Sequence, residues 1–304
     1  MTLVISSTLF AVMAAGAKLA TRRLPGPEVA LARFVVGIVV TIVAVAIGAA
    51  RVRPRRWGWL AARGIFGGSA VVAYFVSIQS VPVGVATLLN QTQPIYTMLF
   101  SWALLGERPR RSALAALALT LLGVTVIVNG GIGMGGALFS FSLSSMRDVR
   151  GELLGIFSAV ASGVAVTSIR AARRDLGDGK PSETAWSVFF SFSLLGALVS
   201  LPTVFPPFGH FIPPTSGEWA LLIGVGLVST AAQVIMSASL LHLTGVQSGI
   251  IAQLTVPITV VLGIGLLGEH LTAGFLIGGC VTVSGVLLAI LMAAPKRPAT
   301  GPAL

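Results

Sequence analysis

Small and polar residues recur at helical spacing inside several strongly apolar segments of this chain. In segments 83–105 and 218–241 they fall at steps of three and four, which places them on one face of a helix. The residues of these two stripes are Ala86, Asn90, Gln93, Thr97 and Ser101, followed by Gly226, Thr230, Gln233 and Ser237. Amide and hydroxyl groups in such stripes can hold a small polar ligand by hydrogen bonds.

Five polar or aromatic side chains within apolar segments are our candidates for substrate binding. They are Tyr74, Asn90, Gln93, Gln233 and Gln253. Polar groups inside a membrane-spanning helix are costly unless they face a cavity or a partner. The alternative is hydrogen bonding between helices, worth about 0.6–2 kcal/mol per bond, and the sequence leaves both interpretations open. Three aromatic residues of one segment are expected at the membrane interface or against lipid rather than in a cavity: Trp186, Phe189 and Phe190.

Four further residues are candidates for gating or conformational change: Lys18, Arg33, Pro94 and Pro257. Lys18 and Arg33 lie near predicted helix ends, where long basic side chains extend to the membrane surface. The alternative is that they attract or gate an anionic or zwitterionic substrate, and Glu28 could pair with either. The two prolines each free a carbonyl one turn earlier and permit a kink, which could be static or could let the helix flex.

Catalytic and metal chemistry is not predicted. The three histidines lie in or near loops, and neither metal-ligand spacing nor a nucleotide-binding G-x-x-x-x-G-K-[ST] motif occurs. We therefore expect no catalytic residues, no metal and no cofactor. The nine acidic residues all fall in loops or at predicted helix ends, so no carboxylate is predicted at the membrane midplane to exchange a proton for a cation.

The segments that carry these residues are too apolar for a water-soluble fold. The chain has 304 residues, of which 55% are hydrophobic and 10% charged, whereas soluble domains average about 25% charged residues. The mean hydropathy is +0.95. A membrane-spanning helix needs about 20 apolar residues, and ten such segments are present: 3–20, 29–48, 64–80, 83–105, 112–128, 151–170, 184–201, 218–241, 246–267 and 271–293. The first is expected to be a membrane helix rather than a signal peptide, because no basic region precedes it.

The basic residues predict orientation and exclude nucleic acid. The net charge of +11 comes from short basic runs between apolar segments, which is typical of membrane proteins. Fourteen Lys and Arg, including a run from Arg51 to Arg63, fall on one side of the predicted topology and six on the other. This excess predicts that the protein lies in the inner membrane with both termini on the cytoplasmic side.

The two halves of the chain resemble each other. LLGERPRRSALAALALTLLGVTVIV matches LLGEHLTAGFLIGGCVTVSGVLLAI, with Glu107 aligned to Glu269 and a proline in each preceding segment. Both glutamates are expected to stabilise helix N-termini, and gating is the alternative role. We divide the chain into a first five-helix repeat (1–131), a Gly/Ser-rich linker (132–150), a second repeat (151–294) and a tail (295–304). An odd number of helices makes the repeats inverted, as in alternating-access transporters.

This duplicated pattern resembles the drug/metabolite transporter superfamily, and in particular an EamA-type permease. Lys18, Arg33 and the sequence Gly151-Glu152-Leu153-Leu154 that opens the second half add to the resemblance. The resemblance implies an all-α membrane protein with ten transmembrane helices as two inverted five-helix repeats. It also implies secondary transport of a small organic metabolite by alternating access, without ATP hydrolysis. The superfamily handles many chemical classes, so the resemblance implies no particular substrate.

Other functions and partners follow from the same pattern. A membrane-embedded scaffold or assembly subunit, or a membrane enzyme, is the alternative to a transporter. The expected partners are a small-molecule metabolite and membrane lipids, with no nucleic acid. Gly274 and Gly278 form a G-x-x-x-G pair that could join two copies of the chain as a homodimer or pack helices within one bundle.

Overall fold

The computed structural model describes most of the first 239 residues and scattered residues beyond them. The described residues are 2–80, 89–90, 92–106, 111–131, 146–173, 183–239, 251–255, 258, 261–262, 277–278, 280–281, 283–285 and 287–288. This part of the chain is helical and contains no β-strand. Its eight delimited helices are α1 (Thr2–Ala20), α2 (Gly26–Ala46), α3 (Trp57–Ser80), α5 (Gln93–Leu105), α6 (Arg111–Gly131), α7 (Met146–Arg173), α8 (Ala185–Val204) and α9 (Ser216–Ser239).

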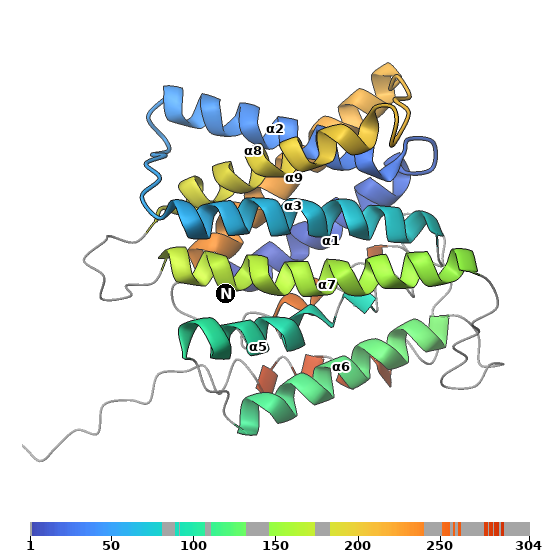
Figure 1. Ribbon diagram of the computed structural model, residues 1–304. Helices are drawn as coiled ribbons and strands as arrows, with labels where there is room; N and C mark the ends of the chain where they lie inside the picture. The colour runs from blue at the N-terminus through green and yellow to red at the C-terminus, as the bar shows by residue number, and fades with distance from the viewer. Residues whose placement is uncertain are drawn as a thin grey trace, which may run out of the picture.

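The helices form a bundle in which α3 and α7 lie side by side, with α2 and α8 beyond α3 and with α5 and α6 beyond α7 (Figure 1). Six of the described helices are long and apolar enough to cross a membrane: α1, α2, α3, α7, α8 and α9. The predicted all-helical membrane fold is confirmed at this level. The last two predicted spans, 246–267 and 271–293, lie largely outside the described residues, so the number ten stays a prediction.

Two predicted spans differ from the structure. The third helix begins at Trp57, seven residues before the predicted start at 64, so Arg63 lies inside a helix and not in a loop. The span predicted over 83–105 is interrupted: Thr92 lies in a turn, its N–H bonding the Leu89 carbonyl at 3.1 Å, and α5 begins at Gln93. Pro94 lies in the first turn of α5, where a residue without an N–H costs the helix no hydrogen bond.

Helices from the two halves of the chain pack together, and each such pair has a counterpart in which the roles of the two halves are swapped. In order along the chain, α1, α2 and α3 are the first three spans of one half, and α7, α8 and α9 are the first three of the other. The helix α1 packs on α9 and α7 packs on α3; α2 packs on α9 and α8 packs on α3; α2 and α8 pack on each other. A two-fold relation between two copies of one unit produces this pairing.

Two hydrogen bonds between the halves are related in the same way. The Ser6 hydroxyl on α1 donates to the Ala232 carbonyl on α9 at 2.8 Å. The Ser158 hydroxyl on α7 donates to the Ala70 carbonyl on α3 at 2.9 Å. Each bond joins a first-helix serine to a third-helix carbonyl of the opposite half, so Ala70 and Ala232 occupy equivalent positions.

Close contact between α3 and α8 joins the halves in the middle of the bundle. A Cβ atom added at Gly68 would lie 2.6 Å from the Cα of Gly196, and one added at Gly196 would lie 2.7 Å from the Phe34 ring. Glycine is therefore required at both positions for the two helices to approach and for Phe34 to fit between them. Phe34, Phe189, Phe192 and Leu222 belong to the largest buried apolar cluster among the described residues.

Loops from opposite halves are joined at both ends of α2. At its C-terminal end, the Glu183 carboxylate accepts hydrogen bonds from the N–H groups of Arg55 and, at 2.6 Å, of Arg56. At its N-terminal end, Arg23 pairs with the Glu218 carboxylate. A 21-residue helix is about 30 Å long, so these two loop clusters lie at opposite faces of the bundle.

We expect Gly68→Val to reduce the folded yield and the thermal stability of the detergent-solubilised protein, because the new side chain would overlap the backbone of α8. Overpacking of this kind costs about 1–3 kcal/mol. The control is Gly224→Val on α9, where an added Cβ meets nothing within 4 Å. Equal melting temperatures for the two variants would show that the α3–α8 contact does not set the stability of the bundle.

Candidate functional site

Two buried arginines meet at one aromatic ring inside the bundle. Arg33 on α2 is 6% exposed, and Arg63 on α3 is 5% exposed. The guanidinium carbon of Arg63 lies 3.9 Å from the centre of the Phe192 ring, and that of Arg33 lies 5.6 Å from it. Phe192, on α8, is 1% exposed. Cations placed over an aromatic face are attracted by the ring quadrupole, so Phe192 holds both guanidinium groups.

The two arginines reach this ring from opposite faces of the bundle. Arg33 is about 10 Å along α2 from its first residue, and Arg63 is about 9 Å along α3 from its first residue, at a rise of about 1.5 Å per residue. A ten-residue loop joins the end of α2 to the start of α3, so the two helices begin at opposite faces. The guanidinium groups therefore meet at an intermediate depth of the bundle.

A hydrogen bond and a glycine fix the position of Arg63. Its Nη2 donates to the Oε1 atom of Gln233 on α9 at 2.8 Å. A Cβ atom added at Gly67 would lie 2.6 Å from Arg63 Nη1 and 2.9 Å from the Phe192 ring. The side chain thus lies between α3, α8 and α9, with Gly67 leaving the space it occupies.

The aromatic neighbours of Arg33 complete the group. Its guanidinium carbon is also 5.6 Å from the centre of the Phe34 ring. Phe34 meets Phe192 edge to face, with ring centres 5.1 Å apart. We call Arg33, Phe34, Arg63, Phe192 and Gln233 the central cluster; its members come from α2 and α3 of one half and from α8 and α9 of the other.

The central cluster carries positive charge that its described neighbours do not neutralise. Within the part of the chain that the structure describes, neither guanidinium forms a salt bridge, and Arg63 Nε is buried without a hydrogen-bond partner. Glu28, predicted to pair with Arg33 or Lys18, instead accepts a hydrogen bond from the Ile212 N–H at 3.1 Å. The expected extension of Arg33 to the membrane surface is wrong, because the side chain turns into the aromatic core.

The other candidate polar residues have different partners. The Asn90 amide donates to the Ser158 hydroxyl on α7 at 2.7 Å. This is a hydrogen bond between helices, the alternative that the sequence left open beside substrate binding. The Gln93 amide donates to the Thr97 hydroxyl of its own helix at 2.7 Å. Tyr74 is partly buried against the central apolar core, and Gln253 is buried. Of the five candidates, the described contacts bring Gln233 into the central cluster.

The candidates for gating are dispersed. Lys18 is exposed in the last turn of α1, and Pro94 is buried in the first turn of α5. Pro257 lies outside the described residues, as do Glu107, Glu269 and Gly274. Of the gating candidates that the structure describes, Arg33 is the one in the central cluster.

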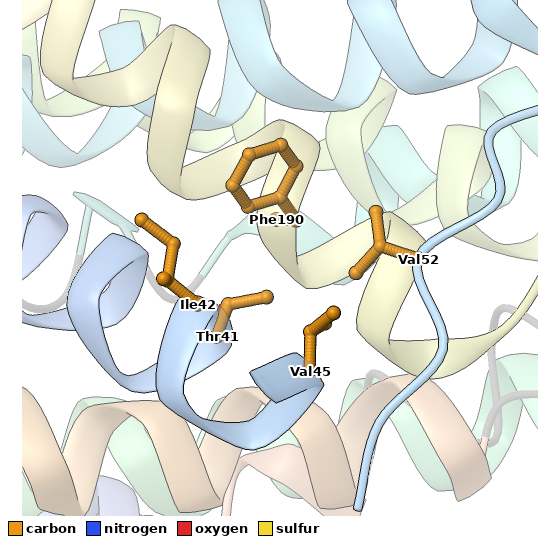
Figure 2. Close-up of a pocket in the computed structure, with 5 residues that line it drawn as sticks. All are labelled: Thr41, Ile42, Val45, Val52 and Phe190. Carbon is orange, nitrogen blue, oxygen red and sulfur yellow. The ribbon is translucent and has the colours of Figure 1, made fainter. Parts of the chain in front are cut away.

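The aromatic residues of α8 divide between core and periphery. Phe189 is buried in the central core, so the expected interfacial position is wrong for it. Phe190 lines a pocket with Thr41, Ile42, Val45 and Val52 at the end of α2 (Figure 2). The Thr41 hydroxyl donates to the Gly37 carbonyl of its own helix at 2.8 Å, so the pocket is lined by apolar groups and suits a hydrocarbon chain better than a polar solute.

Sequence reasoning missed Arg63 and Phe192. The basic run from Arg51 predicts a loop that includes Arg63, because an arginine lowers the local hydropathy, although Trp57 and Trp59 mark an earlier helix start of the kind found at membrane interfaces. No pattern in the sequence distinguishes Phe192 from the other phenylalanines of its segment.

Comparison with known proteins identifies the family. The model of the EamA-like transporter family matches residues 1–129 and 149–291. The chain is 29% identical to the pseudopaline exporter CntI of Pseudomonas aeruginosa over 239 residues, which are 79% of this chain and 77% of that protein. It is 26% identical to solute carrier family 35 member G1 of Homo sapiens over 192 residues, covering 60% of this chain and 48% of that protein.

A solved crystal structure resembles this one with a TM-score of 0.76 at 23% identity, over 96% of each chain, a likeness that concerns the fold alone. The family match covers both halves of the chain and leaves out residues 130–148 between them and 292–304 at the end. The relatives are named as transporters or carriers, and the described helices are those of a multi-pass membrane protein. The chain belongs to the EamA-like transporter family.

Proposed function

We propose that this protein is a secondary transporter that moves a small organic metabolite across the inner membrane by alternating access, without ATP hydrolysis. The observation that carries the proposal is the central cluster, which is buried at intermediate depth and built from both halves of the chain. Transporters of repeated architecture bind their substrate at such a position, between the repeats. The similarity to an exporter supports the same function.

In this proposal the chain has ten membrane helices in two inverted repeats, with both termini cytoplasmic. The loop clusters at the two ends of α2 join opposite halves, through Glu183 at one face and through the Arg23–Glu218 pair at the other. Opening the protein to one side requires one cluster to separate while the other holds. Arg63 and Arg33 lie within helices, so neither belongs in the count of basic loop residues. Leaving them out lowers that count by one on each side of the membrane, and the predicted orientation is unchanged.

Gln233 is the candidate binding residue that the contacts favour most, since it orients Arg63 within the cluster. Tyr74, Asn90, Gln93 and Gln253 remain proposed contributors to the substrate path. Lys18, Pro94 and Pro257 remain proposed conformational residues. A scaffold or an enzyme remains the alternative function, and flux measurements separate both from a transporter.

Transport is tested with proteoliposomes incubated in a ¹³C-labelled bacterial metabolite extract, with the accumulated compounds identified by mass spectrometry. We expect saturable uptake of at least one labelled metabolite that protein-free liposomes do not take up. Gln233→Leu should reduce this uptake by about tenfold or more, because it removes the acceptor of a charged hydrogen bond. Thr8→Val, which removes only a bond within α1 from an exposed side chain, is the comparison variant and should keep the uptake of the wild type. Folded protein that takes up no labelled compound would favour the scaffold.

The inverted topology is tested with single cysteines placed beside Glu107 and Glu269, in a chain whose exposed Cys280 is replaced by serine. We expect an impermeant thiol reagent to label one position in intact cells and the other in inside-out vesicles, because an odd number of helices reverses the second repeat. Labelling of both positions from the same side would contradict the inverted repeats.

A further inference from the structure

We propose that Arg33 and Arg63 form an oxyanion-binding site and that the transported metabolite is an organic anion. The juxtaposition that carries the proposal is two buried guanidinium groups on one phenylalanine ring, without a carboxylate partner among the described residues. The proposal rests on the proposed function, since it assigns a substrate class to the same central cluster.

The charge of the central cluster is the first step of the argument. A guanidinium group is not deprotonated in proteins, and a buried charge is costly unless an opposite charge or several hydrogen bonds compensate it. Arg63 has the Gln233 amide and the Phe192 ring, whereas Arg33 has two ring faces and donates no hydrogen bond to the residues that the structure describes. Rings and amides orient these cations but supply no negative charge.

The internal repeat carries an apolar residue at the position equivalent to Arg63. Ala70 and Ala232 are equivalent, because each accepts the serine bond from the opposite half. Seven residues before Ala232 is Val225, and seven before Ala70 is Arg63. Val225 is buried in the apolar core, so a valine packs the equivalent place. The arginine therefore adds a property that packing alone does not require.

The chemistry of the ligand follows from the donors. Planar guanidinium groups bind carboxylate and phosphate oxygens by paired, charge-assisted hydrogen bonds. Arg63 commits one donor to Gln233, and the remaining N–H groups of both arginines are the donors that an oxyanion would use. The buried rings of Phe34, Phe189 and Phe192 beside them offer an apolar wall for the organic part of the solute.

The site also explains how binding could couple to movement of the halves. Both arginines belong to the first half, whereas Phe192 and Gln233 belong to the second. An anion that neutralises the arginines removes the charge that opposes burial of the cluster, and this favours a conformation in which the two halves close around it.

The decisive variant is Gln233→Glu, which places a carboxylate 2.8 Å from Arg63 at the position of the present amide oxygen. This internal anion should neutralise the site and exclude the ligand without loss of packing, because the two side chains have the same shape. Arg63→Gln and Arg33→Gln remove the positive charge, and Arg63→Lys keeps the charge but loses the planar donor geometry.

Binding is measured first, as the shift of the unfolding temperature of purified protein with succinate, citrate, glycerol 3-phosphate, and tetraphenylphosphonium as a cation control. We expect at least one of the three anions to stabilise the wild type. The apparent Kd for that anion should rise by about tenfold to a hundredfold in Arg63→Gln and Arg33→Gln, the loss of one charged hydrogen bond. In Gln233→Glu the unfolding temperature without ligand should equal or exceed that of the wild type, and the stabilisation by the anion should disappear. Comparing the stabilisation by succinate and citrate with that by glycerol 3-phosphate shows whether the site prefers a carboxylate or a phosphate.

Flux separates this proposal from the proposed function. Saturable flux restricted to cations or neutral compounds would overturn the anion site and leave the transporter intact. Anion binding that depends on both arginines, without flux of any compound, would uphold the site and overturn the transporter. Equal stabilisation of wild type and Gln233→Glu by the anions would show adventitious binding and overturn the site. If the glutamine variants of the arginines do not fold, Arg63→Lys and Gln233→Glu provide the same comparison.

Discussion

Keeping two guanidinium groups inside an apolar bundle is the constraint on which the centre of this structure depends. The Phe192 ring receives both groups, and three glycines make room for the arrangement. A Cβ at Gly67 would collide with Arg63 and Phe192, one at Gly196 with Phe34, and one at Gly37 with Phe189. Because these positions lack side chains, α2, α3 and α8 approach closely enough to enclose the cluster.

The architecture around the cluster is symmetric, but the cluster is not. Helix pairs, serine bonds and loop clusters all recur with the halves exchanged. The arginines belong to one half only, with a valine at the position equivalent to Arg63. A duplicated scaffold can therefore supply the same packing twice, while side chains that differ between the halves give the centre its charge.

The loop clusters show how the same scaffold could hold its ends. Glu183 accepts bonds from backbone N–H groups of the α2–α3 loop, and Glu218 pairs with an arginine of the α1–α2 loop. Both carboxylates lie outside the central cluster, at the two faces of the bundle. At one face the acidic residue joins the halves together with a basic one, Arg23, whereas both charged side chains of the central cluster are arginines.

The sequence by itself determined the all-helical membrane class, the duplication and the candidacy of Gln233 and Arg33. Long apolar segments, a repeated Leu-Gly-Glu motif and polar residues at helical steps are local features, so a pattern along the chain can reveal them. Only the tertiary structure decided that Arg63 lies inside a helix, that Phe192 is the ring on which the arginines meet, and that Asn90 joins two helices. The Arg63–Gln233 bond links residues 170 positions apart. The hydrogen bond to a residue so far away in the sequence helps to compensate the burial of Arg63. A hydropathy profile cannot show such a partner and indicates only that an arginine lowers the local hydropathy.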